Sequence, residues 1–270
     1  MARTIYNKPT RALLKDMLEE WKLDAGETFP AKRAVEWFAA NYPKLKSGSI
    51  IAHLVQASTN DRSRLHHPAT NTTDDLLFRV GSREYRLYSP GIDPAPIHPP
   101  EKMQVPTTDG GSLSVAEEEE EDDATTPAEA LLSGSSQFLL EKDLQRYLAE
   151  NLHLIEPGLT IFQDEDITGF EYPAGGGRRI DILAKDQAGG FVVLELKVEK
   201  GYDRVVGQLL RYVNWVRTEL AEPGQRVRGV IVCRSMSQDL ILACASVPDI
   251  ELFEYQLSVT VSQLKRLTLP

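Results

Sequence analysis

The chain has 270 residues, of which 41% are hydrophobic and 26% are charged, as is typical of soluble globular proteins. No window approaches the roughly 18 consecutive apolar residues of a membrane-spanning helix, and the N-terminal segment lacks the apolar core of a signal peptide. Two cysteines, Cys233 and Cys244, are too few for a disulfide scaffold or a four-ligand zinc site. We therefore expect a cytoplasmic protein in a reducing setting, without a membrane partner.

The net charge of −10 belongs to one segment of the chain. Residues 1–89 hold 14 basic and 10 acidic residues, residues 90–136 hold 1 and 11, and residues 137–270 hold 15 and 19. Residues 90–136 are also rich in proline, glycine and serine, a composition that is too polar to fold. We interpret them as a disordered acidic linker between two domains, or alternatively as an acidic decoy that competes with DNA for a basic face of the same chain.

Residues 1–89 contain three helical patterns followed by a hairpin pattern. Apolar residues recur at helical spacing in residues 9–21, 30–42 and 47–58, and two alternating segments flank Gly81 and Ser82 within residues 75–89. Pro30 suits the start of the second helix. Three helices and a β-hairpin outline a winged helix, so we expect a small, winged-helix-like α+β domain over residues 1–89.

A winged helix places its third helix toward a DNA groove and uses the hairpin as its wing. Polar residues on the third helix, on the segment after it and on the wing are therefore candidates for contacts with DNA: His53, Gln56, Asn60, Arg62, Arg64 and Arg83. The alternative is a winged helix that binds proteins, with arginines that only solvate its surface. An excess of four positive charges is modest for a DNA-binding domain.

Residues 137–270 follow the order αβββαβαβ. Helical patterns occupy residues 137–151, 203–220 and 237–247, and strand patterns occupy residues 160–167, 178–184, 190–198, 227–234 and 250–257. The strands late in this order are continuously apolar, which is typical of a sheet covered on both faces. We expect one α/β domain here, with a mixed sheet flanked by helices.

Two of the predicted strands carry charges where a buried strand should carry none. Asp181 lies in the first strand, and Glu195 and Lys197 lie in the second, on the same face as Val193. If the turn at 185–190 makes these strands neighbours, the two carboxylates converge, and desolvating them without partners would be costly. A Mg²⁺ ion resolves that cost, since it prefers oxygen ligands such as the two carboxylates and a backbone carbonyl, here that of Leu196.

Such a metal site suits phosphodiester hydrolysis, because the ion polarises the phosphate and lowers the pKa of a bound water. Lys197 can orient the attacking water or neutralise the transition state, and Arg178 or Arg179 can hold a phosphate by a bidentate contact. The alternative is a buried ion-pair cluster with a structural role alone. The spacing D-x(13)-E-x-K on paired apolar strands favours the catalytic interpretation.

These residues resemble the signature of the PD-(D/E)xK nuclease superfamily, with isoleucine in place of the proline. Gln208 and Tyr212, one turn apart in the next helical pattern, resemble the Q-x-x-x-Y element of several of its branches. More narrowly, residues 137 to about 235 resemble the catalytic domain of NucS-type endonucleases. The segments that carry this resemblance are EKDLQRYLAENLHLIEPGL, GGGRRIDILAKDQAGGFVVLELKVEK and VVGQLLRYVNWV.

The resemblance implies a restriction-endonuclease-like fold and a DNA endonuclease that depends on Mg²⁺ or Mn²⁺. The two carboxylates would be metal ligands and the lysine would be catalytic. The resemblance also implies that Glu141, at the start of the first helix, belongs to the acidic site, and that Gln208 and Tyr212 support the site or contact the substrate. NucS enzymes carry a β-rich N-terminal dimerisation domain, from which the helical residues 1–89 depart.

A DNA-reading domain joined to a nuclease is the arrangement of many restriction or phage-defence enzymes, so we expect that role. One alternative is a repair endonuclease for mismatched or branched DNA. A second is a non-catalytic DNA-binding or scaffold protein that has kept a nuclease fold, against which the intact Asp181, Glu195 and Lys197 argue. Cutting both strands needs two sites, so we expect a homodimer, and no small-molecule cofactor besides the metal.

Overall fold

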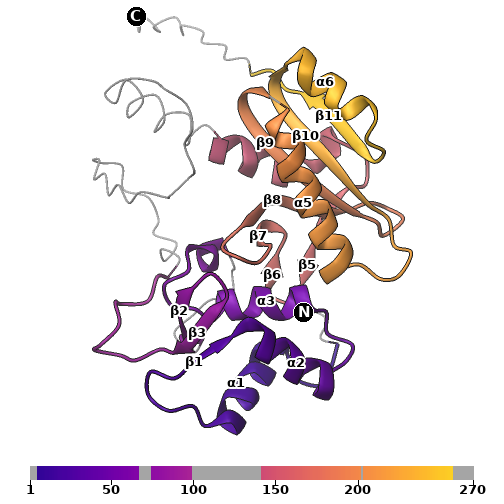
Figure 1. The fold of residues 1–270 in the computed structure, drawn as a ribbon. Coiled ribbons are helices and arrows are strands. Elements are labelled where there is room, and N and C mark those ends of the chain that lie inside the picture. Colours follow the sequence, from indigo (N-terminus) through magenta and orange to yellow (C-terminus); the bar gives the residue numbers. More distant parts are fainter. Residues whose placement is uncertain (1–4, 67–73, 99–140, 202, 258–270) are drawn as a thin grey trace, which may run out of the picture.

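The computed structural model describes residues 5–66, 74–98, 141–201 and 203–257, which form an N-terminal and a C-terminal part (Figure 1). The predicted acidic run of the linker, residues 117–123, lies outside the described residues. Among the described residues, no helix combines the length and the hydropathy needed to cross a bilayer.

The N-terminal part contains the three predicted helices and the predicted hairpin. Its elements are α1 (Thr10–Trp21), β1 (Thr28–Pro30), α2 (Ala31–Asn41), α3 (Ser47–Gln56), the 3-10 helix η1 (Arg62–His66), β2 (Leu77–Gly81) and β3 (Glu84–Leu87). The sequence pattern missed β1, which is too short to show alternation. It pairs antiparallel with β3 and gives a three-stranded sheet in the order β1-β3-β2.

Helix α1 shows why the helical patterns were informative. Its residues Leu13, Leu14, Met17 and Leu18 are buried together, because positions three and four apart share one face of a helix. They pack in one core with Phe29 of β1, and with residues of α2, α3 and the hairpin.

The C-terminal part is built around a six-stranded mixed sheet. Its elements are a helix over residues 141–150, the 3-10 helix η3 (Leu152–Leu154), β4 (Thr160–Ile161), β5 (Gln163–Asp164), β6 (Ile167–Thr168), β7 (Phe170–Pro173), β8 (Arg179–Lys185), β9 (Phe191–Gly201), α5 (Arg204–Glu219), β10 (Val227–Met236), α6 (Gln238–Ala245) and β11 (Ile250–Glu254). The strand order is β11-β10-β9-β8-β4, and β7 also pairs with β8. Strands β9, β10 and β11 run parallel, whereas β8 is antiparallel to β9.

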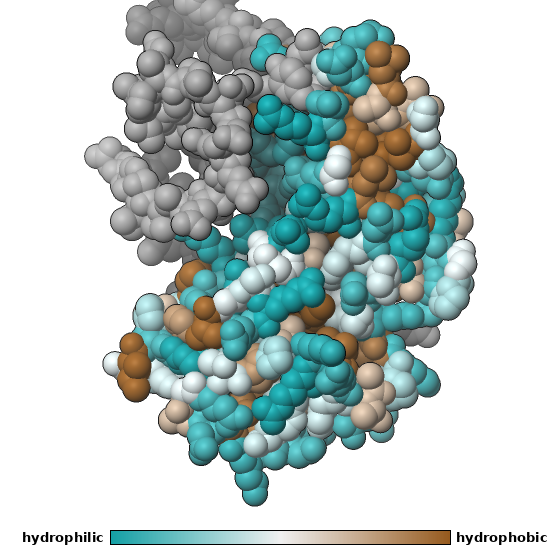
Figure 2. Space-filling view, in the orientation of Figure 1, coloured by the Kyte–Doolittle hydropathy of each residue, from teal (hydrophilic) through white to brown (hydrophobic). Residues whose placement is uncertain are grey.

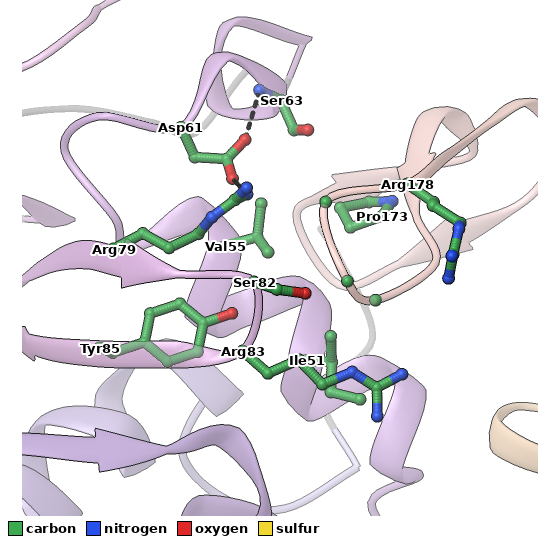
Figure 3. A pocket seen from close by; sticks show the side chains of 13 residues that line it. Ile51, Val55, Asp61, Ser63, Arg79, Ser82, Arg83, Tyr85, Pro173 and Arg178 are labelled. Carbon is green, nitrogen blue, oxygen red and sulfur yellow. Dashed lines mark hydrogen bonds and ion pairs between the residues drawn. The ribbon is translucent and has the colours of Figure 1, made fainter. Parts of the chain in front are cut away.

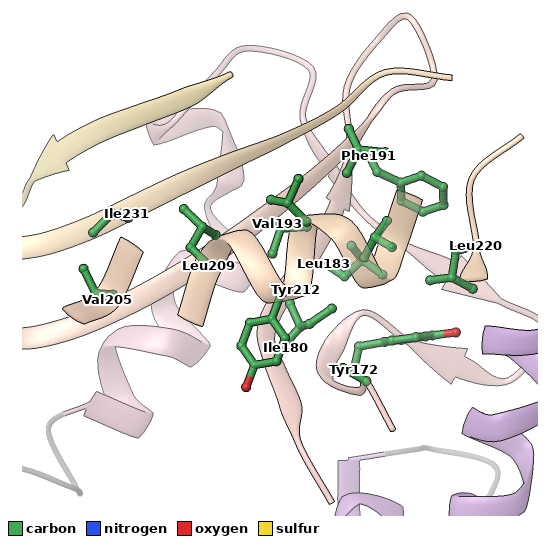
Figure 4. Close-up of a cluster of buried hydrophobic side chains, with 14 of the residues drawn as sticks. Tyr172, Ile180, Leu183, Phe191, Val193, Val205, Leu209, Tyr212, Leu220 and Ile231 are labelled. Carbon is green, nitrogen blue, oxygen red and sulfur yellow. The ribbon is translucent and has the colours of Figure 1, made fainter. Parts of the chain in front are cut away.

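Helices cover both faces of this sheet, as the sequence predicted. Helices α5 and α6 pack on one face, where Val193 of β9 and Leu209 of α5 belong to the same core (Figure 4). Leu144 and Leu148 of the 141–150 helix pack on the other face, with Leu194 and Leu196 of β9. The alternation of side chains along β9 therefore divides its residues between two cores.

The strand predicted at residues 160–167 is broken, and β7 was not predicted. β4 ends at Ile161, and the chain then turns into the short hairpin of β5 and β6. The Gly169 N–H donates to the Phe162 carbonyl, and the Leu183 N–H donates to the Gly169 carbonyl, both at 2.7 Å. These backbone bonds hold the hairpin against β8, and the alternation of side chains does not reveal them.

Helix α3 joins the two parts of the chain. Every residue from Gly48 to Gln56 is buried, and α3 packs against both β7 and α5, with Ala52 inside the core that α5 covers. Polar contacts surround this helix: the Thr10 N–H donates to Glu165 (2.7 Å), Lys46 pairs with Glu222 (2.9 Å) and Arg179 donates to Ser63 (3.3 Å). The two parts are thus in extensive contact.

The visible surface is mainly hydrophilic, and part of its hydrophobic area lies at the upper right of Figure 2. Helix α6 occupies that region in Figure 1, and its residues Ile241 and Leu242 are exposed. Cys233 and Cys244 are buried and are not joined by a disulfide.

We predict that Gly169→Ala destabilises the protein by about 2 to 3 kcal/mol, since an added Cβ atom would lie 2.0 Å from the Leu183 carbonyl oxygen. The measurement is urea denaturation followed by circular dichroism. Gly207→Ala is the matched control, because its Cβ would meet no atom within 4 Å and alanine favours a helix by up to about 1 kcal/mol. Equal denaturation midpoints for the two variants would contradict the prediction.

Candidate active site

The pairing of β8 with β9 brings the predicted carboxylates together. Ile182 lies opposite Leu194 in the antiparallel register, so the next positions along the two strands are Asp181 and Glu195. The predicted turn connection between these strands is confirmed. Both strands lie inside the sheet, between β4 or β7 on one side and β10 on the other.

Specific contacts fix the charged side chains at this point of the sheet. The Leu196 N–H donates to Asp181 Oδ2 at 2.8 Å, and Lys197 Nζ lies 3.0 Å from Glu195 Oε1 in an ion pair. Glu195 is fully buried, whereas the Lys197 side chain is 37% exposed. The ammonium group therefore lies at the boundary between the buried carboxylates and solvent.

Burial and mutual repulsion disfavour the ionised carboxylates. Desolvation, followed by the charge of Glu195, raises the pKa of Asp181 well above its usual value. Desolvation also raises the pKa of Glu195 to about 7, although Lys197 opposes that shift. Desolvation lowers the pKa of Lys197, but Glu195 and Asp181 outweigh it and leave that pKa raised. The charge of Lys197 thus only partly offsets the cost of ionising these carboxylates.

The remaining predicted site residues also face this cluster. Glu141, on the 141–150 helix, is close enough to raise the pKa values of Asp181 and Glu195. On α5, Gln208 forms a side-chain hydrogen bond with Tyr212, whose pKa is raised first by burial and then by the charge of Glu195. Three separate segments therefore contribute side chains to one site.

The donor set fits a divalent cation. Both carboxylate oxygens of Glu195 are buried without a hydrogen-bond partner, although Oε1 has the ion pair with Lys197. Unpartnered buried carboxylate oxygens are costly, and hard cations such as Mg²⁺ take such ligands. Leu196 contributes its N–H to Asp181, and the assignment of its carbonyl as a metal ligand stays a prediction.

Sequence reasoning missed Gln145 as a residue of this site. Gln145 is buried, and its Nε2 donates to the Asp181 carbonyl oxygen at 2.7 Å, which holds the 141–150 helix against β8. The signal was its spacing from Glu141, because residues four apart share one face of a helix.

The structure overturns three of the predicted DNA contacts. His53, Gln56 and Arg64 are at most 3% exposed, because α3 lies between the two parts and Arg64 pairs with Asp75 inside the N-terminal part. They cannot touch DNA in this arrangement. Helix α3 is enclosed because it packs against α1 and α2 on one side and against β7 and α5 on the other.

The other five predicted DNA contacts lie at or near the surface. Arg62, Arg83 and Arg178 are exposed, Arg179 is partly buried beside Glu171, and Asn60 binds the backbone of Arg79. Two of them meet at a pocket between the parts, where the β2–β3 turn faces the turn before β8 (Figure 3). There the side chains of Arg83 and Arg178 approach the adjacent residues Gly175 and Gly176.

We predict that Glu195→Gln stabilises the metal-free protein at pH 8 by about 3 kcal/mol and leaves stability at pH 4 nearly unchanged. A carboxyl group whose pKa rises to about 7 on folding contributes its stability below the unfolded pKa and loses it as pH rises toward 7. Thermal denaturation in a chelator measures this. Glu150→Gln, at an exposed position, is the control. A gain that is constant with pH would be inconsistent with this account.

Residues 140–246 match the family model described as the endonuclease NucS C-terminal domain, and residues 9–87 match one described as a domain of unknown function (DUF7669). The endonuclease NucS of Methanopyrus kandleri is 36% identical over 114 residues, or 41% of this chain and 40% of that protein. That of Micrococcus luteus is 35% identical over 115 residues, or 40% and 45%. The chain thus spans about two-fifths of the length of these relatives.

Two solved structures match at lower similarity. The repair endonuclease from Pyrococcus abyssi has a TM-score of 0.35 and 24% identity over 50% of each chain. A complex of EndoMS with double-stranded DNA has a TM-score of 0.32 and 26% identity, over 53% of this chain and 51% of that one. The resemblance of the C-terminal part to NucS-type endonucleases, predicted from sequence motifs, is confirmed by the family match and by the NucS relatives.

Proposed function

We propose that the protein is a DNA endonuclease that depends on a divalent cation, with its active site on β8 and β9. The observation that carries the proposal is the convergence of Asp181, Glu195 and Lys197 in a partly buried cluster, in which Glu195 Oε2 is buried without a hydrogen-bond partner. This cluster lies within the residues that match the NucS C-terminal domain. The convergence is expected of a PD-(D/E)xK site.

Asp181 and Glu195 would hold Mg²⁺ or Mn²⁺, and Leu196 offers a carbonyl beside them. When bound, the ion supplies a Lewis acid for the phosphate and lowers the pKa of a coordinated water. It also provides the positive charge that ionises both carboxylates at neutral pH. Gln145 keeps the backbone of Asp181 in place, so the carboxylate does not have to reorganise.

Without a metal, the surrounding carboxylates raise the pKa of Lys197 and favour its charged form. As a cation, Lys197 would orient the attacking water and neutralise charge on the phosphate. Tyr212 also keeps its proton, and its hydroxyl can donate to a phosphate oxygen once Gln208 has oriented it. Glu141 adds a third carboxylate from the 141–150 helix.

We propose that DNA is held by the exposed arginines at the junction of the two parts. Arg83 lies on the β2–β3 turn and Arg178 lies three residues before Asp181, so a strand bound at both would pass beside the active site. The order α1-β1-α2-α3-β2-β3 supports a winged helix, in which the wing and Arg62 would contact DNA. The third helix would be a docking element.

The role in restriction or phage defence has no support from the comparisons, in which the curated relatives are NucS endonucleases. The DNA-repair alternative is therefore the role we propose. Comparing the rates of cleavage of mismatched, branched and plain duplexes would identify the preferred substrate. A homodimer and domain boundaries at residues 89 and 137 also stay proposals.

We predict that Asp181→Asn and Lys197→Met each lower cleavage of DNA in Mn²⁺ by about 100- to 1,000-fold while the protein stays folded. Cleavage of plasmid and of labelled duplexes, together with circular dichroism, measures this. Lys185→Met is the matched control, since Lys185 is a partly buried lysine on the same sheet that packs over Phe191.

Equal cleavage by the wild type and both variants would refute the proposed active site. Absence of cleavage by the wild type on every duplex would favour the non-catalytic DNA-binding alternative. Unfolding of Lys197→Met, with Lys185→Met folded, would instead support a purely structural ion-pair cluster.

We predict that Arg83→Ala and Arg178→Ala each weaken binding to duplex DNA several-fold and reduce the salt dependence of the binding constant by about one unit of slope. Fluorescence anisotropy in a chelator, over a series of salt concentrations, measures binding without cleavage. Arg226→Ala is the control, because Arg226 is similarly exposed but pairs with Asp249 at 2.9 Å. A slope unchanged by the first two substitutions would place the DNA elsewhere.

A further inference from the structure

A second cluster of ionisable groups lies where α3 meets the hairpin of β5 and β6. His53 comes from α3, and Glu165 and Asp166 form the turn between the two strands. His53 is buried and the two acidic residues are partly buried, with side-chain exposures of 1%, 4% and 16% for His53, Glu165 and Asp166. The cluster is separate from the proposed active site and contains residues of both parts of the chain.

The distances within this cluster are those of ligands around a metal. His53 Nε2 lies 3.7 Å from Glu165 Oε2 and 3.5 Å from Asp166 Oδ1, and all three atoms lie within 4.8 Å of one another. A hydrogen bond between N–H and oxygen spans about 2.7–3.2 Å, so these separations are too long for good ones. Tetrahedral ligands at about 2.1 Å from a zinc ion lie about 3.4 Å apart.

His53 is oriented as metal-binding histidines are. Its Nδ1–H donates to the Ser49 carbonyl oxygen at 2.9 Å, which leaves Nε2 directed at the two carboxylates. Nε2 is buried and has no hydrogen-bond partner. Histidine ligands in metal sites usually donate their other ring N–H to a carbonyl or carboxylate in this way.

The two carboxylates are also supported from outside the cluster. The Thr10 N–H, at the start of α1, donates to Glu165 Oε2 at 2.7 Å. Arg11 lies 3.3 Å from Asp166 Oδ2, whereas Asp166 Oδ1, the atom facing His53, is buried without a hydrogen-bond partner. Supporting bonds of this kind fix the direction of ligating oxygens.

We propose that His53, Glu165 and Asp166 bind one zinc ion that links the N-terminal part to the C-terminal part. The neutral imidazole and two carboxylates balance the charge of the ion, and water completes its coordination. The alternative occupant of the cluster is a proton on Nε2. That proton would point at two oxygens beyond good hydrogen-bonding distance, whereas the zinc ion would fill the same space with three bonds.

The test measures zinc bound by the full-length chain, after equilibrium dialysis and elemental analysis. The background is Asp181→Asn, which removes a ligand of the proposed active site and so separates the two sites. We expect one zinc ion per chain in this background. His53→Gln or Asp166→Asn, added to it, should weaken zinc binding by more than about 100-fold.

His98→Gln in the same background is the matched control, since His98 pairs with Asp75 at 3.1 Å and, within the described part of the chain, belongs to no group of three candidate ligands. It should bind zinc like the background. Cobalt substituted for zinc should show the intense visible absorption of a tetrahedral ion, and should lose it in Asp166→Asn. Unchanged zinc binding in either ligand variant, or none in the background at micromolar zinc, would overturn the proposal. Both variants are checked for folding by circular dichroism. The result does not depend on cleavage of DNA.

Discussion

The free-energy cost of burying the Glu195 carboxylate is the main constraint on the C-terminal part. A carboxylate on an interior strand is tolerated only if its surroundings supply positive charge or hydrogen bonds. Here Lys197 supplies part of that charge, and the remaining deficit raises the pKa values of both Glu195 and Asp181. The two apolar cores on either side of β9 hold the strand rigidly, so the carboxylates cannot escape to solvent. The sheet thereby keeps the two carboxylates at the position where the proposed cation would bind.

The second constraint is the enclosure of α3. This helix belongs by sequence to the N-terminal part, yet Ala52 lies in the core beneath α5. Because α3 is buried, His53 and Gln56, which were predicted to contact DNA, lie instead within the helix that docks the two parts. In the function that we propose, the exposed Arg83 of the β2–β3 turn would contact DNA, beside the loop that precedes β8.

The sequence predicted an element correctly where the spacing of its apolar residues was enough to determine it. The alternation in β9 predicted that Glu195 and Lys197 share a face, and the turn before it predicted pairing with β8. It failed where the deciding contact was distant in the chain. The pattern of α3 predicted a helix with one polar side that faces DNA, and no local pattern identifies its partners as β7 and α5. Likewise, Glu165 and Asp166 fell inside the strand predicted at residues 160–167, and their relation to His53 exists only after the two parts dock.

The placement of Ala52 has a consequence for how such proteins diversify. The boundary suggested by composition falls in the acidic segment, whereas the boundary of the hydrophobic core falls inside α3. Recombination at the acidic segment would therefore separate a helix from the surface that covers it. The N-terminal part would then expose the buried face of α3 to water, and the C-terminal part would lose a wall of its core. Exchange of one part would therefore leave apolar surface exposed unless the new partner covers it.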